Sequence, residues 1–161
     1  MPDSPLRVRV VTVSTRAAAG RYVDRSGPAA VEVLRAAGHQ VDDPVVVADG
    51  VGVTEALIQA VSHAYDVVLT VGGTGLAPDD RTPEMTRAIV DREVPGLAEV
   101  LRADGVARGV PTASLSRGVA GVVGGTLVVN LPGSVGGARD GASLLAPLLR
   151  HAVDQMAGGD H

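Results

Sequence analysis

Residues 66–84 read DVVLTVGGTGLAPDDRTPE, and the rest of the chain is organised around them. The apolar run from Val67 to Val71 is rich in β-branched residues and too short for a typical helix, which predicts a strand buried on both faces. The run ends in Gly72-Gly73-Thr74-Gly75, where the backbone is free to adopt positive φ and to lie close against a ligand. A helix is expected next, with Thr82 as its N-cap and Pro83 at its first position.

This strand, loop and helix have a functional and a purely structural interpretation. Ligands collect at the carboxyl ends of strands in open α/β sheets, and free backbone N–H groups suit phosphate. A carboxylate such as Asp79 or Asp80 can hold the Mg²⁺ that accompanies phosphate. Many Gly-rich turns nevertheless bind nothing, and Pro78-Asp79 also suits a surface turn. The stretch alone leaves both interpretations open.

The composition suits a single domain over residues 1–161, with a frayed tail expected at 157–161. All 14 basic residues are Arg and there is no Cys, which excludes a Walker-type phosphate loop, Lys Schiff-base chemistry, thiol nucleophiles and Cys-based zinc sites. A net charge of −4 and an aromatic content of 1% argue against nucleic-acid binding. No membrane-length apolar segment and no signal peptide are visible, so we expect a cytoplasmic protein without membrane contact.

The first half of the chain alternates predicted strands and helices. Strands are expected at residues 7–13 and 41–48, the second interrupted at 42–44, with a helix at about 26–37 between them. Asp49 follows the second strand, where ligands are expected if the sheet is parallel. Because Asp-Gly is also a common turn pair, the residues alone favour an ordinary turn at Asp49-Gly50. Thr54 is expected to cap the next helix.

The second half contains a hairpin signal and a second Gly-rich loop. The helix after Thr82 is expected to reach about residue 92, and another begins at Pro95. Two β-branched runs flank Gly124-Gly125, which indicates a β-hairpin and therefore a mixed sheet. Residues 131–137 are either a plain loop or a second anion cradle in which Ser134 donates. The last helix, about 138–156, carries an apolar stripe typical of a core or a subunit interface.

Four motifs follow one another along nearly the whole chain: Val71-Gly72-Gly73-Thr74-Gly75, Asp80-Arg81-Thr82-Pro83-Glu84, Leu115-Ser116-Arg117 and Asn130-Leu131-Pro132-Gly133-Ser134. Together they resemble the signature of the Mog/MoaB family of molybdenum cofactor biosynthesis, which includes the G-type domains of gephyrin and its plant counterpart. Within the family, the pattern is most similar to the Mog proteins of actinobacteria. The resemblance implies a three-layer α/β/α fold with a mostly parallel mixed sheet and a β-hairpin, assembled as a homotrimer.

The resemblance also implies an activity, molybdopterin adenylyltransferase. This enzyme transfers AMP from ATP to the terminal phosphate of molybdopterin with Mg²⁺, releases pyrophosphate, and passes the product to a molybdate-inserting partner. Family members that adenylylate depend on two aspartates, which match Asp49 and Asp80 here as catalytic and metal-binding residues; this match reverses the turn interpretation of Asp49. The implied substrate-binding residues are Gly72, Gly73, Thr74, Gly75, Ser116, Arg117, Pro132, Gly133 and Ser134.

Three positions depart from the family pattern. Thr15 stands where many members have Asp, Val71 where Thr or Ser is usual, and Val135 where Pro is usual. These changes leave both aspartates in place. An alternative of a different class is a molybdopterin-binding protein without adenylylation. Retention of Asp49 and Asp80 favours the transferase, because binding a pterin needs no metal carboxylate.

Overall fold

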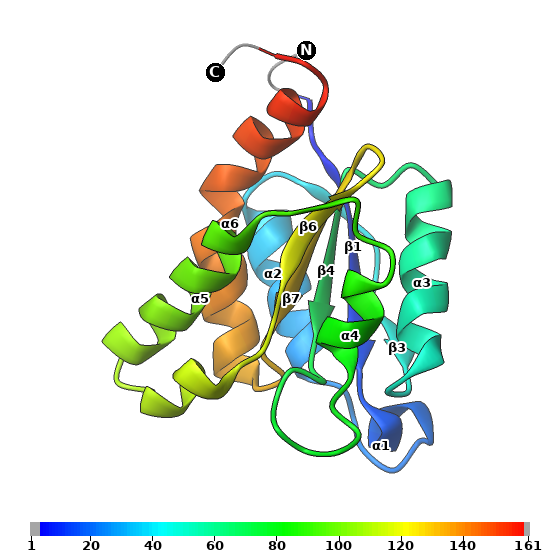
Figure 1. Ribbon diagram of the computed structural model, residues 1–161, viewed down its shortest axis with the longest axis vertical. Coiled ribbons are helices and arrows are strands. Elements are labelled where there is room, and N and C mark those ends of the chain that lie inside the picture. Colours follow the sequence, from blue (N-terminus) through cyan, green and yellow to red (C-terminus); the bar gives the residue numbers. More distant parts are fainter. Residues whose placement is uncertain (1–3, 160–161) are drawn as a thin grey trace.

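The strand predicted at the centre of the chain is β4 (Val67–Val71), and all five of its residues are buried. It lies between β1 (Arg7–Val13) and β7 (Thr126–Leu131) and pairs in parallel with both. The computed structural model describes residues 4–159 of the chain (Figure 1). A strand with a parallel neighbour on each side and helices over both faces is expected to be apolar, and β4 is so except at Thr70, whose buried hydroxyl accepts from Asn130.

The sheet has the strand order β2-β1-β4-β7-β6-β5, with β3 also beside β1. β2 (Gln40–Val41) and β3 (Val45–Val47) both pair in parallel with β1, on either side of the predicted interruption. β6 (Ala120–Val123) forms the predicted hairpin with β7, and β5 (Arg92–Glu93) pairs with β6; both pairings are antiparallel. The sheet is therefore mixed and mostly parallel, as predicted.

Helices cover both faces of the sheet (Figure 1). On one face, α2 (Ser26–Ala36), α5 (Pro95–Ala107) and α6 (Val135–Met156) pack over a core that includes Leu69. On the other, α3 (Val51–Ser62) and α4 (Thr82–Arg87) pack over a core that includes Val68. Without Phe or Trp, the core is built almost entirely from aliphatic side chains, with Tyr65 as an aromatic member. Each fully buried Val or Leu is worth roughly 1.5–3 kcal/mol. The predicted three-layer α/β class is confirmed.

Two helix starts differ from the predictions. α3 begins directly after Gly50, whose φ is +100°, so Thr54 lies inside the helix and is not its N-cap. Thr82 is likewise not a cap but the first residue of α4, after Arg81. α4 also ends at Arg87, earlier than expected, because the chain then turns towards β5; there the backbone N–H of Asp91 donates to Val122 O at 2.9 Å.

Two loops contain more helix than expected. α6 begins at Val135, because Ser134 Oγ accepts from the backbone N–H of Gly137 at 3.0 Å and caps the helix. The second loop follows β1, where the segment Thr15–Ala18 forms the short helix α1. Outside these two loops, Pro111–Leu115 forms the 3₁₀ helix η1. α6 ends at Met156. Of the tail predicted at 157–161, residues 160 and 161 lie outside the described part of the chain.

Candidate functional site

The two Gly-rich loops meet at the carboxyl ends of β4 and β7. The backbone N–H of Gly72 donates to Leu131 O at 3.0 Å. A Cβ on Gly72, whose φ is +106°, would stand 2.4 Å from Val13 O, and one on Gly133 would stand 3.2 Å from the α-carbon of Gly72. Only glycine leaves enough room for this contact between main chains. The parallel pairing of β4 and β7 thus brings together two loops far apart in sequence.

A pocket of about 500 Å³ opens beside these loops. Its walls come from both loops, from α5 and η1, and from the first turn of α6. The predicted site residues that line it are Gly73, Thr74, Gly75, Asp80, Ser116, Pro132, Gly133 and Ser134. The structure therefore gathers most of the predicted substrate-binding residues around one cavity, of a size that holds a small molecule.

Asp49 lies behind the first Gly-rich loop and is held there by Thr15. Thr15 Oγ1 donates to Asp49 Oδ2 at 3.0 Å and accepts from the backbone N–H of Asp49 at 3.2 Å. Asp49 Oδ1 is buried and has no hydrogen-bond partner among residues 4–159. A Cβ on Gly73 would stand 2.8 Å from this oxygen. The residue that departs from the family pattern thus orients the carboxylate and leaves its other oxygen unpaired beside the loop.

Asp80 adjoins the same loop from its other end. Its Oδ2 accepts from the backbone N–H of Ala77 at 3.1 Å, and a Cβ on Gly75 would stand 2.8 Å from that oxygen. Burial raises the pKa of Asp49, and the negative charges of Asp79 and Asp80 raise it further. The two predicted aspartates, remote in sequence, therefore lie on the same side of the molecule and within reach of each other's charge.

The donor set suits a hard cation that arrives with phosphate. No group of three His, Cys, Asp or Glu side chains able to hold a metal occurs in the described residues. Mg²⁺ needs no such cage, because it is usually bound by one or two carboxylates together with substrate phosphates and water. An unpaired, buried carboxylate oxygen on Asp49 is the kind of ligand it takes. The residues present fit Mg²⁺ bound together with a phosphate group.

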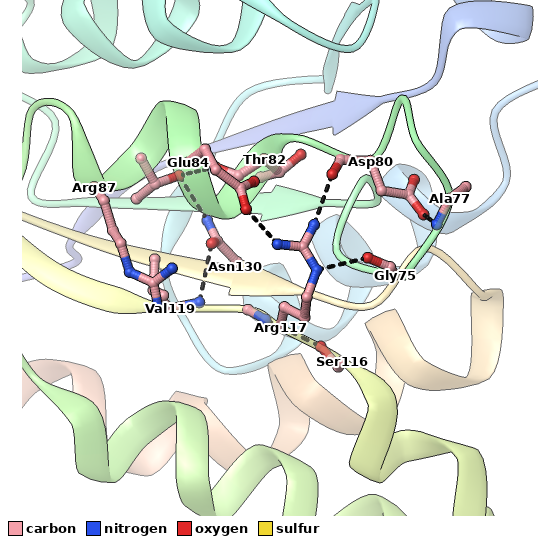
Figure 2. A network of polar contacts seen from close by, with 12 residues as sticks. Gly75, Ala77, Asp80, Thr82, Glu84, Arg87, Ser116, Arg117, Val119 and Asn130 are labelled. Carbon is pink, nitrogen blue, oxygen red and sulfur yellow. Dashed lines mark hydrogen bonds and ion pairs between the residues drawn. The ribbon is translucent and has the colours of Figure 1, made fainter.

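Arg117 ties three parts of the site together (Figure 2). Its guanidinium donates to Gly75 O at 2.8 Å and Asp80 O at 2.7 Å, and it pairs with Glu84 at the start of α4. This hydrogen bond is the main reason that the pKa of Glu84 is lowered. Arg117 does not appear among the residues around the large pocket. In this geometry it braces the loop, and its role as a phosphate ligand stays a prediction.

Sequence reasoning missed two residues that support the site. Asn130 is buried and joins three elements: its amide donates to Thr70 Oγ1 at 2.9 Å and Thr86 Oγ1 at 3.0 Å, and its Oδ1 accepts from the backbone N–H of Val119 at 3.0 Å (Figure 2). Arg102 donates to Gly118 O at 3.0 Å and lines the pocket. Asn130 was visible as part of a motif, whereas nothing in the spacing of α5 distinguishes Arg102.

A family model described as "Probable molybdopterin binding domain" matches residues 9–151. The chain belongs to this family. It is 34% identical to the molybdopterin adenylyltransferase of Helicobacter pylori strain J99, over 95% of this chain and 89% of that protein. The solved structure of the Mog protein from Mycobacterium ulcerans is 47% identical, with a TM-score of 0.89, and the match covers 97% of this chain and 99% of that one. The resemblance inferred from the four motifs is confirmed.

A second kind of relative is longer. The chain is 39% identical to the molybdenum cofactor biosynthesis bifunctional protein of Synechococcus elongatus, over 94% of this chain and 48% of that protein. A bifunctional protein of the same name from Chlorobaculum tepidum is matched over 50% of its length. The chain thus spans about half the length of these curated relatives.

Across the described residues, helices of sufficient length and apolarity to cross a bilayer are absent.

Proposed function

We propose that this protein acts in molybdenum cofactor biosynthesis as a molybdopterin adenylyltransferase, moving AMP from ATP to the terminal phosphate of molybdopterin and releasing pyrophosphate. The observation that carries the proposal is the convergence of Asp49 and Asp80 on the Gly72–Gly75 loop, beside a pocket of about 500 Å³. Relatives named molybdopterin adenylyltransferase at 34% identity over most of the chain support it.

The reaction needs no side chain to act as a general acid or base. The attacking group is a phosphate that is already an anion, so a bond from its oxygen to the α-phosphorus forms as the bond to pyrophosphate breaks, without a catalytic base. The protein's tasks are to align the two substrates and to stabilise the charge that develops in transfer. When bound, Mg²⁺ supplies neutralisation of the triphosphate charge, and Asp49 and Asp80 are the residues that would hold it.

The remaining site residues bind and orient the substrates. Residues 73–75 line the pocket, and their backbone N–H groups suit phosphate oxygens, whereas the N–H of Gly72 is already donated to Leu131 O. Ser134 caps α6 and lines the pocket together with Gly136 and Gly137, so the positive end of the helix dipole lies beside the pocket. Ser116 also lines the pocket. ATP as co-substrate, assembly as a homotrimer, a cytoplasmic location and a molybdate-inserting partner remain predictions from the resemblance, and sedimentation tests the trimer.

The decisive measurement is transfer of AMP from α-labelled ATP to molybdopterin. Asp80→Asn and Asp49→Asn keep the side-chain shape and remove the charge, so each should abolish transfer while pterin binding persists. Asp43→Asn is the matched control, because it removes the same charge from a side chain that is 92% exposed, and it should retain transfer. An active Asp80→Asn protein refutes its assigned role. A wild-type protein that binds molybdopterin and transfers no AMP supports the binding-only alternative.

A further inference from the structure

Thr82 carries a buried hydroxyl that the fold does not use. The residue is fully buried at the start of α4, and its Oγ1 has no hydrogen-bond partner in the part of the chain that the structure describes. Thr86, one turn later on the same helix, is equally buried, but its Oγ1 donates to Thr82 O at 2.8 Å and accepts from Asn130. Unpaired buried hydroxyls are costly and rare in folded proteins, so that of Thr82 needs an explanation.

The position of the Thr82 hydroxyl explains why it could lack a partner within the protein. A Cβ on Gly73 would stand 2.2 Å from Thr82 Oγ1 and 2.8 Å from Asp49 Oδ1, so both oxygens flank the same α-carbon. Across residues 4–159, these are the two buried side-chain oxygens without a hydrogen-bond partner. They come from different parts of the chain, Asp49 from the segment between β3 and α3 and Thr82 from α4. Gly73 itself lines the pocket.

We propose that Thr82 is a metal-site residue, whose hydroxyl acts with Asp49 Oδ1 to hold the Mg²⁺ ion of the nucleotide complex, directly or through a water of its hydration shell. The inference rests on the proposed function and deepens it. Mg²⁺ takes hard oxygen ligands, and a Ser or Thr hydroxyl serves it in phosphate-binding loops. Asp80 keeps its assigned place at the other end of the loop, where its Oδ2 accepts from the backbone N–H of Ala77.

The test measures metal binding apart from turnover. Mn²⁺ replaces Mg²⁺, and electron paramagnetic resonance counts free Mn²⁺ in the presence of α,β-methylene-ATP, from which AMP cannot be transferred. Thr82→Val removes the hydroxyl and keeps the shape, and it should weaken Mn²⁺ binding by about tenfold or more. Thr82→Ser should bind as wild type does. Thermal melting of Thr82→Val should be unchanged or raised, because a methyl group replaces an unpaired hydroxyl.

Thr86→Val is the matched control on the same helix. It removes a hydroxyl that is fully paired, so it should lower the melting temperature and leave Mn²⁺ affinity unchanged. If Thr82 and Asp49 act on one ion, the losses from Thr82→Val and Asp49→Asn should be clearly non-additive. Wild-type Mn²⁺ affinity in Thr82→Val, or a loss that merely follows a fall in stability, overturns the assignment. A wild-type protein that binds the metal–nucleotide complex but transfers no AMP refutes only the proposed function.

Discussion

The two ends of β4 differ in whether the buried polar groups near them have hydrogen-bond partners. At the amino end, the hydroxyl of buried Tyr65 accepts from Arg9 at 2.6 Å and donates to Asp42, while the guanidinium carbons of Arg7 and Arg9 lie 4.6 and 4.7 Å from its ring centre. At the carboxyl end, Asp49 Oδ1 and Thr82 Oγ1 lack partners among the described residues. Complete pairing serves stability, whereas the unpaired oxygens, which flank the pocket-lining Gly73, are the groups for which we propose a role in binding.

Among variants that keep both aspartates, the largest effect should come from filling the space between the two unpaired oxygens. In Gly73→Ala, the new Cβ would clash with Thr82 Oγ1 and Asp49 Oδ1 at 2.2 and 2.8 Å, on a backbone with φ of +67°. Displacing these groups by a fraction of an ångström or more should lower AMP transfer by about a hundredfold. Steady-state transfer of label from ATP measures the loss.

Gly124→Ala separates the clash from the backbone strain. Gly124 has φ of +57° in the β6–β7 turn, and a Cβ there would meet no described atom within 4 Å. This variant should lose some stability and keep its transfer rate. Equal transfer rates in the Gly73 and Gly124 variants would show that the space beside Gly73 has no functional importance.

The sequence predicts those elements of the fold that leave a local pattern in it. β4 and the β6–β7 hairpin were predictable, because burial on two faces and a Gly-Gly turn leave local patterns. β5 was not, since Arg92 and Glu93 are exposed and join the sheet through two residues of pairing. Edge strands of this length carry no periodicity.

The site was predictable only in part, for a related reason. Asp49 looks locally like an ordinary Asp-Gly turn, and its proximity to Gly73 depends on the parallel pairing of β1 with β3 and β4. Thr82 looks locally like an N-cap, because Thr before Pro at a helix start normally has that role. Its unpaired hydroxyl is a property of the packed structure. The family resemblance supplied the roles of the two aspartates, and only the folded structure reveals that the hydroxyl of Thr82 is unpaired.

A moderate effect on stability alone is expected at the amino end of β4. Tyr65→Phe leaves Asp42 without its hydrogen bond and removes the acceptor of Arg9, so the free energy of unfolding should fall by about 1–2 kcal/mol. Urea denaturation measures this loss, and AMP transfer should stay at the wild-type rate. Tyr22→Phe is the control, because Tyr22 is 50% exposed and the hydroxyl is lost without burial. Reduced transfer in Tyr65→Phe would mean that the two ends of the strand are coupled.

The smallest effect concerns the cost of ionising Asp49. Burial raises the pKa of this carboxyl above its ordinary value, so the folded protein holds the proton more tightly than the unfolded chain does. Ionisation therefore opposes folding at neutral pH, and the penalty fades as pH falls through the raised pKa towards the ordinary one. Asp49→Asn should raise the melting temperature at pH 7 by on the order of a degree or two.

The pH dependence of the difference in melting temperature tests whether the buried charge of Asp49 is its cause. The difference in melting temperature between Asp49→Asn and wild type should shrink as pH falls, because the wild-type carboxyl becomes neutral in both the folded and the unfolded state. Melting curves of Asp43→Asn over the same pH range report the general effect of losing one negative charge. This effect is subtracted from the shift measured for Asp49→Asn. A destabilised Asn variant at pH 7, or a gap that widens in acid, would mean that Asp49 is a structural carboxylate. Its burial would then contribute to stability, and the contrast between the two ends of β4 would disappear.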